Sequence, residues 1–82
     1  MTYREHLMIR EHDTVVLRRD LPTLGLKRGD VGAVVHVYGD GAAVEVEFVA
    51  GAGTTVGVET LELEDVRPLG RDEILHARPI AA

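Results

Sequence analysis

Residues 26–37, LKRGDVGAVVHV, constrain the fold more than any other part of the chain. Gly29 and Asp30 provide a turn, and a valine-rich strand follows whose second residue is Gly32. The period of two that governs a strand places apolar side chains on both faces of this segment. Such a strand fits a tightly curled sheet. The run therefore predicts a small all-β domain, and it contains no catalytic or phosphate-binding motif.

The 82 residues are enough for one domain with a small core, because a domain of this size buries only about 60 to 65% of the surface that its unfolded chain exposes. The chain has no cysteine, so no disulfide supports the core, and a homo-oligomer would be one way to bury more apolar surface. The lack of cysteine also suits a reducing cytoplasm. No apolar run approaches the roughly 20 residues that cross a bilayer, and the charged start lacks a signal-peptide pattern. We expect a cytoplasmic protein that does not span a membrane.

Glycine turns separate four or five segments rich in β-branched residues, which is typical of short strands. The third segment alternates most clearly, with Val44, Val46 and Phe48 expected to point inward. The alternation of the fourth segment slips near residues 59–60, which predicts a β-bulge there. The predicted strands are Thr14–Leu17, Val31–Tyr38, Ala43–Val49 and 55–61, followed by a one-turn helix at 65–68 and a short closing strand.

The chain divides into an N-terminal extension at 1–12, a barrel at 13–69 and a C-terminal tail at 70–82. The extension either forms an amphipathic turn or two beside the barrel or is frayed. The tail carries Ile74, Leu75 and Ile80, which either fold back over one end of the barrel or dock into another chain. The predicted core consists of Val15, Leu17, Val31, Val35, Val37, Val44, Val46, Phe48, Val56 and Val58.

Six blocks of the sequence resemble a short bacterial family known as domain of unknown function 4926. They are DTVVL at 13–17, DLP at 20–22, GL at 25–26, GDVG at 29–32, EVEF at 45–48 and DVRP at 65–68. The spacing of the strands, with one long loop after the first, predicts an SH3-like barrel of four to five strands with short flanking N- and C-terminal segments. The resemblance also implies an SH3-like barrel, and it implies no catalytic residues. The chain departs from the family pattern at GAGTTVG, residues 51–57, where relatives tend to have a charged turn. The GDVGAVVHV segment is also similar, more weakly, to KOW-type units of ribosomal and transcription proteins.

No residue cluster predicts metal or enzyme chemistry. Of the four histidines, His6, His12, His36 and His76, only the first two come near a ligand spacing, and a metal site needs three or four converging ligands. His36 is more simply a packing residue beside Tyr38. The chain contains neither serine nor cysteine, and a packed barrel leaves little room for the cleft that a pair of catalytic carboxylates needs. We therefore expect a protein that is not an enzyme and binds no metal or cofactor.

Two charged groups are the candidate partner-binding residues. Basic residues bracket the loop between the first two strands, where the simplest explanation is pairing with Asp20, Asp30 and nearby acids. Acidic residues are expected to share the outer surface of neighbouring strands, either as a solvated face or as a surface complementary to a basic partner. With Tyr38, the candidate set is Arg18, Arg19, Lys27, Arg28, Glu45, Glu47 and Glu59.

The charge balance favours a protein partner. Fourteen acidic residues against nine basic ones give a formal charge of -5, which disfavours approach to a phosphate backbone. We therefore expect a non-enzymatic protein-binding module, antitoxin-like or an accessory subunit, acting on an operon-encoded partner. The alternative is a nucleic-acid or ribosome-associated KOW-like barrel.

Overall fold

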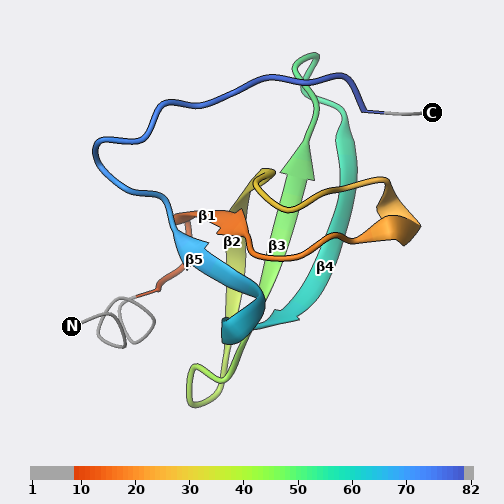
Figure 1. Cartoon of the computed structure of the whole chain (residues 1–82). Coiled ribbons are helices and arrows are strands. Elements are labelled where there is room, and N and C mark those ends of the chain that lie inside the picture. The colour runs from red at the N-terminus through yellow and green to blue at the C-terminus, as the bar shows by residue number, and fades with distance from the viewer. Residues whose placement is uncertain (1–8, 81–82) are drawn as a thin grey trace.

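The computed structural model describes residues 9–80, which form one antiparallel sheet of five strands (Figure 1). Two short 3-10 helices lie in the connections, η1 (Pro22–Leu24) and η2 (Leu63–Asp65). The all-β class is therefore confirmed. Most of the N-terminal extension lies outside the described residues. The strands are β1 (Thr14–Leu17), β2 (Val31–Tyr38), β3 (Ala43–Val49), β4 (Thr55–Glu62) and β5 (Val66–Pro68).

The strands follow the order β4-β3-β2-β1-β5, so the last strand returns to pair with the first. Val16 on β1 lies opposite Arg67 on β5, and η2 links β5 directly to β4. Among residues 9–80 no ladder joins β4 to β5, and the hydrogen-bonded sheet is open at these two strands. The one-turn helix predicted at 65–68 is wrong in position. The helical turn is η2, and the backbone is already extended at Val66, with φ of -135° and ψ of 164°.

Side chains on one face of the sheet, the inner face, form the core together with residues of the loops. Val15, Leu17, Val44, Val46 and Phe48 are buried as predicted, and Val37 and Val56 pack against them while remaining half-buried. Val31 is also half-buried. The core includes six further residues that the strand alternation did not identify: Ile9, Leu21, Leu26, Val34, Leu61 and Val66.

The predicted inner face of β2 is wrong in its first half. Val34 is fully buried, whereas Val35 is 41% exposed. The β2–β3 register shifts between Val34 and His36, so Val35 is an extra residue at a β-bulge. The bulge lets Val34 and Val37, which are three residues apart, lie on the same face.

The bulge of β4 also lies elsewhere than predicted. Pairing with β3 is continuous through residues 59–60, and its register shifts near Val56, between the pairs Phe48–Gly57 and Val49–Thr55. Leu61 therefore lies on the inner face, opposite the buried Val44. The predicted core residue Val58 points the other way and is 48% exposed.

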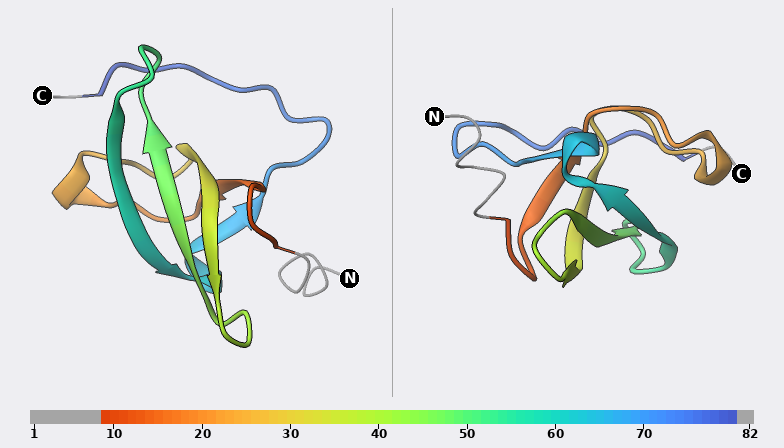
Figure 2. Two further views of the ribbon diagram at one scale, coloured as in Figure 1. Left: turned by 180° about the vertical axis from the view of Figure 1, so that it is seen from behind. Right: turned by 90° about the horizontal axis from the view of Figure 1, so that it is seen from below.

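Two long segments cover the inner side of the sheet. The loop at 18–30 crosses in front of β3 and β4 before returning to β2 (Figure 1), and Leu24 of η1 approaches Gly57 on β4. The segment 70–80, here called the tail, then runs past the tip of the β3–β4 hairpin on the same side as the loop (Figure 2). The tail thus runs back over the domain, but Ile74 and Leu75, which were expected to fold back or to dock into another chain, are 92% and 64% exposed.

Candidate protein-binding surface

The face of β2, β3 and β4 that points away from the core is here called the outer face. It mixes exposed apolar side chains with polar and acidic ones. Val35, Tyr38 and Val58 are 41%, 39% and 48% exposed, values high for large apolar or aromatic residues in strands. The register places the following residues on this face: Ala33, Val35, His36, Tyr38, Glu45, Glu47, Val58 and Thr60.

The carboxylates of the outer face lie among specific neighbours. Glu45 is directly opposite His36 on β2 and Thr60 on β4. Glu47 Oε2 accepts a hydrogen bond of 2.7 Å from the hydroxyl of Thr55. Both glutamates are half-buried, so their stems contribute apolar surface while their carboxylates remain accessible.

His36 is the centre of a polar cluster at one end of the outer face. Its Nδ1 lies 3.6 Å from Oε2 of Glu11, and both side chains are about half exposed. The imidazole meets the ring of Tyr38 edge to face, with centroids 4.6 Å apart and an interplanar angle of 84°. His36 therefore packs beside Tyr38 as predicted, on the exposed outer face.

Glu59 does not share the outer face with the other two candidate glutamates. It lies opposite Val46, and directly opposed residues of an antiparallel pair point to the same side of the sheet. Glu59 is thus on the inner face, half-buried, where its charge contributes to raising the pKa of Arg19. The prediction of one shared acidic surface is wrong for this residue because the bulge of β4 lies near Val56 rather than at residues 59–60.

The acids of the 18–30 loop bind backbone amides rather than the neighbouring basic side chains. Asp20 Oδ1 accepts from the N–H of Arg28 at 2.9 Å, and Asp30 Oδ2 accepts from the N–H of Lys27 at 2.8 Å. These bonds close the loop locally, in the manner of side-chain-stabilised turns. The expected pairing of Asp20 and Asp30 with basic side chains of the loop gives way to this arrangement.

Arg19 is the candidate basic residue with a defined ionic partner. Its Nε donates to Oδ1 of Asp65 at 2.8 Å, which ties the start of the loop to η2. This hydrogen bond raises the pKa of Arg19 and lowers that of Asp65. The pair reduces the positive charge that Arg19 offers to a polyanion. Arg18, Lys27 and Arg28 have exposed side chains on the same loop.

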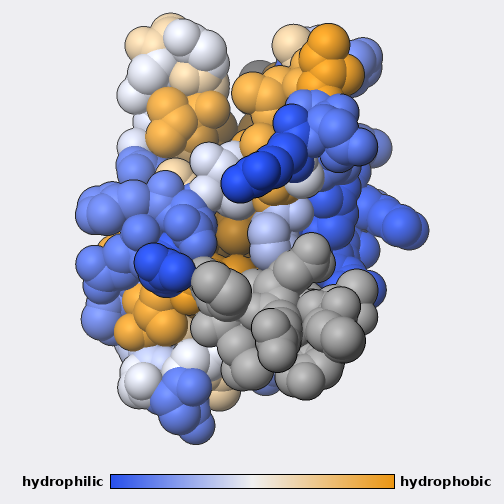
Figure 3. Space-filling view, turned by 90° about the vertical axis from the view of Figure 1, so that its left-hand side faces the viewer, coloured by the Kyte–Doolittle hydropathy of each residue, from blue (hydrophilic) through white to orange (hydrophobic). Residues whose placement is uncertain are grey.

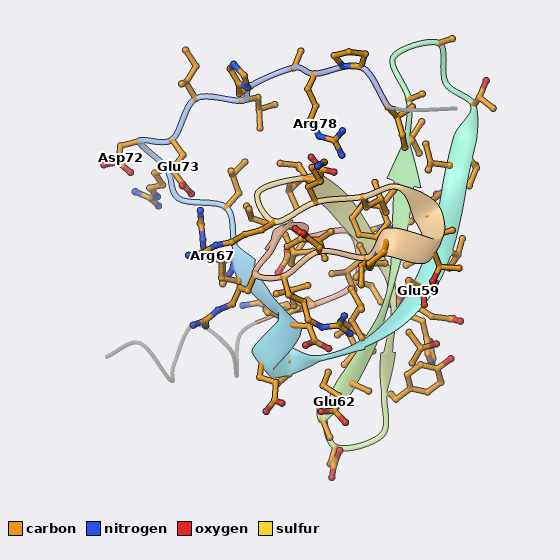
Figure 4. The ribbon with its side chains drawn as sticks, turned by 45° about the vertical axis from the view of Figure 1, so that its right-hand side comes forward. Glu59, Glu62, Arg67, Asp72, Glu73 and Arg78 are labelled. Atoms are coloured by element: carbon orange, nitrogen blue, oxygen red, sulfur yellow. The ribbon has the colours of Figure 1, made fainter. Side chains whose placement is uncertain are left out.

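The loop also receives a residue that sequence reasoning missed. Arg78 of the tail donates from Nε to Asp30 Oδ1 at 2.9 Å and from Nη2 to the carbonyl oxygen of Gly25 at 3.1 Å. A second bond joins Nη2 to Asp30 Oδ2. Figure 4 shows Arg78 pointing from the tail toward this loop. No sequence signal links positions 30 and 78, which are 48 residues apart.

A groove of about 610 Å³ lies between the tail and the hairpin end of the sheet. Leu26, Val31, Val49 and Val56 contribute from the body, and Ile80 is among the tail residues that border it. Figure 3 shows a notch at the upper end of the molecule with hydrophobic residues on both sides. The tail covers this groove only in part.

The start of the tail is fixed by a second arginine. Arg67 of β5 donates from both terminal nitrogens to the two carboxylate oxygens of Glu73, each at 2.7 Å. Glu73 Oε1 also accepts from the N–H of Gly70 at 2.6 Å. The Arg67 guanidinium and this amide lower the pKa of Glu73 to about 2. Arg67 and Glu73 are labelled in Figure 4.

Between residues 9 and 80 the structure contains no group of three or more His, Asp or Glu side chains arranged to hold a metal ion. His6 lies outside this range. His12 occupies a turn with a positive φ of 76°, and His76 borders the groove.

No polar or charged residue in this part of the chain is buried. Its helices, both single 3-10 turns, are too short to cross a membrane.

Comparison with known proteins identifies a family. The family described as Domain of unknown function (DUF4926) matches residues 11–68. No curated protein and no solved structure matches. The matched range contains all five strands and the 18–30 loop, and it ends before the tail.

Proposed function

Because the chain belongs to the DUF4926 family, a domain of unknown function, we propose from its surface that it is a non-enzymatic protein-binding module whose outer face is the docking surface. The observation that carries this proposal is the exposure of apolar and aromatic side chains on β2 and β4, on either side of Glu45 and Glu47 of the central strand β3. Exposed large apolar side chains gathered on one face of a folded domain mark a candidate interaction surface.

The charges indicate the kind of protein that fits. Glu45 and Glu47 stand on the same face of β3 two residues apart, and Thr55 orients the second carboxylate. A partner with lysine or arginine at its centre and apolar side chains on both sides of it matches this pattern. Opposite charges on the two partners speed the encounter more than they tighten the complex.

The same charges weigh against a nucleic-acid partner. The net charge is -5, and Arg19, one of the four candidate basic residues, is already paired with Asp65. Among residues 9–80 the aromatic residues that could stack on single-stranded bases are scarce, since Phe48 is buried and Tyr38 lies against His36. A KOW-like nucleic-acid barrel therefore remains the alternative outcome of the test below.

We also propose a fold family and a biological setting for the domain. Short strands, one long loop after β1 and a 3-10 turn before β5 support an SH3-like barrel. A bacterial protein acting as an antitoxin-like or accessory subunit for an operon-encoded partner follows from the family resemblance alone, which is a fold-level analogy. The absence of cysteine is consistent with the cytoplasm.

Site-specific photo-cross-linking in the native host tests the outer face. A photoreactive residue at Val58 should yield a discrete cross-linked protein, whereas the same residue at the exposed Glu64 of η2 should not. Reversing both charges, with Glu45→Lys and Glu47→Lys, should reduce the Val58 product at least about tenfold, because the introduced lysines would repel a basic partner. Equal products from both positions would contradict the proposal. Salt-dependent retention of the chain on heparin would instead favour the nucleic-acid alternative.

A further inference from the structure

The tail is bound to the domain by side chains rather than by the sheet. Within residues 70–80 no strand is formed, and the structure records a single backbone hydrogen bond within that segment, from Glu73 to Gly70. Ionic contacts hold it at two points, Arg67 with Glu73 near its start and Arg78 with Asp30 near its end. A segment attached in this way can leave the domain without breaking a ladder.

The receptor for Arg78 is built entirely by the 18–30 loop. The N–H of Lys27 holds one oxygen of Asp30, and Gly25, with φ of 72°, presents its carbonyl beside it. Two carboxylate oxygens and one carbonyl oxygen match the fork of donors on a guanidinium, which a lysine cannot satisfy. The Arg78 and Asp30 side chains are only 29% and 18% exposed, so the contact is partly shielded from water.

The apolar part of the site continues from the arginine receptor. Leu26 and Val31 lie next to Gly25 and Asp30 in the sequence and border the groove together with Val49. The tail fills this groove poorly, since Ile80 remains 36% exposed and Leu75 64% exposed. The receptor residues all lie within residues 11–68, the range shared with the family, whereas the arginine that occupies the receptor lies outside it.

We propose that Asp30, the Gly25 carbonyl and the adjoining apolar groove bind an extended segment of a partner protein in which an arginine is followed within two residues by an aliphatic side chain. The tail, with Arg78-Pro79-Ile80, occupies this site in the free protein and acts as an autoinhibitory strap. A phosphate backbone does not fit, because Asp30 would repel it. The inference rests on the protein-binding function proposed above but assigns a second surface, separate from the outer face.

Fluorescence anisotropy with a labelled peptide of residues 73–82, EILHARPIAA, tests the site on the full-length chain. The substitution Arg78→Ala releases the strap, so this variant should bind the peptide at least about tenfold more tightly than the wild type. In the wild type the tethered tail competes with the peptide at a millimolar effective concentration. Arg71→Ala, which changes another exposed tail arginine, should bind like the wild type. The peptide with its arginine replaced by alanine should lose at least about tenfold in affinity.

A double variant combining Arg78→Ala with Asp30→Asn completes the test. Asparagine keeps an oxygen for the N–H of Lys27 but lacks the charge, so peptide affinity should fall at least about tenfold. Three outcomes would each overturn the proposal. The wild type and Arg78→Ala could bind the peptide equally, or an Arg78→Ala chain that its amide NMR spectrum shows to be folded could fail to bind it. The third is that binding does not depend on the arginine of the peptide. A wild-type dimer that Arg78→Ala dissociates would also overturn it, since the occupant would then be the tail of a second copy. If Arg78→Ala does not fold, Arg78→Gln takes its place. Cross-linking at Val58 reports on the outer face whatever the peptide result.

Discussion

Phe48 on β3 packs directly against the backbone of Gly32 on β2. A Cβ atom added to Gly32 would lie 2.8 Å from Cε1 of Phe48 and 2.6 Å from Cγ1 of Val46. Real Cβ atoms do not approach neighbours so closely, and all three residues are buried. The missing side chain therefore makes the space into which the largest core residue fits.

Gly32→Ala should destabilise the fold by about 1 to 3 kcal/mol, the usual cost of adding a methyl group to a packed core. Gly51→Ala is the matched control, because Gly51 is exposed in the β3–β4 hairpin with nothing within 4 Å of its added Cβ and no positive φ. The control should change the free energy of unfolding by less than about 0.5 kcal/mol, as is usual for surface positions. Urea denaturation followed by circular dichroism measures both. Equal losses would show that the contact with Phe48 does not limit the packing.

Gly57→Ala should cost less than Gly32→Ala, although the added methyl group also meets a neighbour. The nearest atom is Cδ1 of Leu24 at 2.9 Å, at the far end of a flexible side chain in the half-buried η1 turn. Leu24 can turn away by about 30° from its rotamer at a cost of about 0.5 to 1.5 kcal/mol. The same urea experiment should therefore rank Gly57→Ala between Gly51→Ala and Gly32→Ala. A larger loss than that of Gly32→Ala would mean that the 18–30 loop is held more rigidly than these contacts indicate.

Much of the sheet could be predicted from local pattern, because the alternation of apolar and polar residues and the glycine turns are short-range signals. The strand β3 is the clearest case, with Val44, Val46 and Phe48 all buried as expected. The two bulges could not be placed in this way. Gly32 and Val34 line the inner face because β2 gains a residue at Val35, and that shift is set by pairing with β3 rather than by the sequence of β2 alone.

The candidate surface was only partly predictable for the same reason. Glu45 and Glu47 follow from the alternation of β3, whereas Glu59 moves to the other face with the register of β4. The contact between Asp30 and Arg78 depends on where the tail crosses the loop. A segment without secondary structure gives no periodic signal, so such long-range contacts appear only in the assembled fold.

Asp65 caps η2 and anchors Arg19 at once, which makes it a test of the junction between β4 and β5. Its Oδ2 accepts from the N–H of Glu62 at 3.1 Å, and its Oδ1 accepts from Arg19. Asp65→Ala should lower the free energy of unfolding by about 0.5 to 2 kcal/mol, the range for losing a helix cap. Glu64→Ala, an exposed neighbour in the same turn, is the control and should be close to neutral. Thermal unfolding curves that shift equally for both variants would argue against the cap.

The ion pair between Arg67 and Glu73 predicts an acid-sensitive attachment of the tail. The pKa of Glu73 is lowered from 4.5 to about 2, so the folded state binds this proton less readily than the unfolded state does. The stabilisation is therefore complete above pH 4.5 and is lost as the pH falls through about 2. A ¹³C NMR titration of the Glu73 carboxyl group should show its midpoint near the low value in the wild type. Arg67→Met removes the guanidinium and should move the midpoint back toward 4.5, while Arg71→Met, which alters the nearby tail arginine, should leave it in place. A midpoint that is the same in the wild type and in Arg67→Met would exclude this pair as the cause.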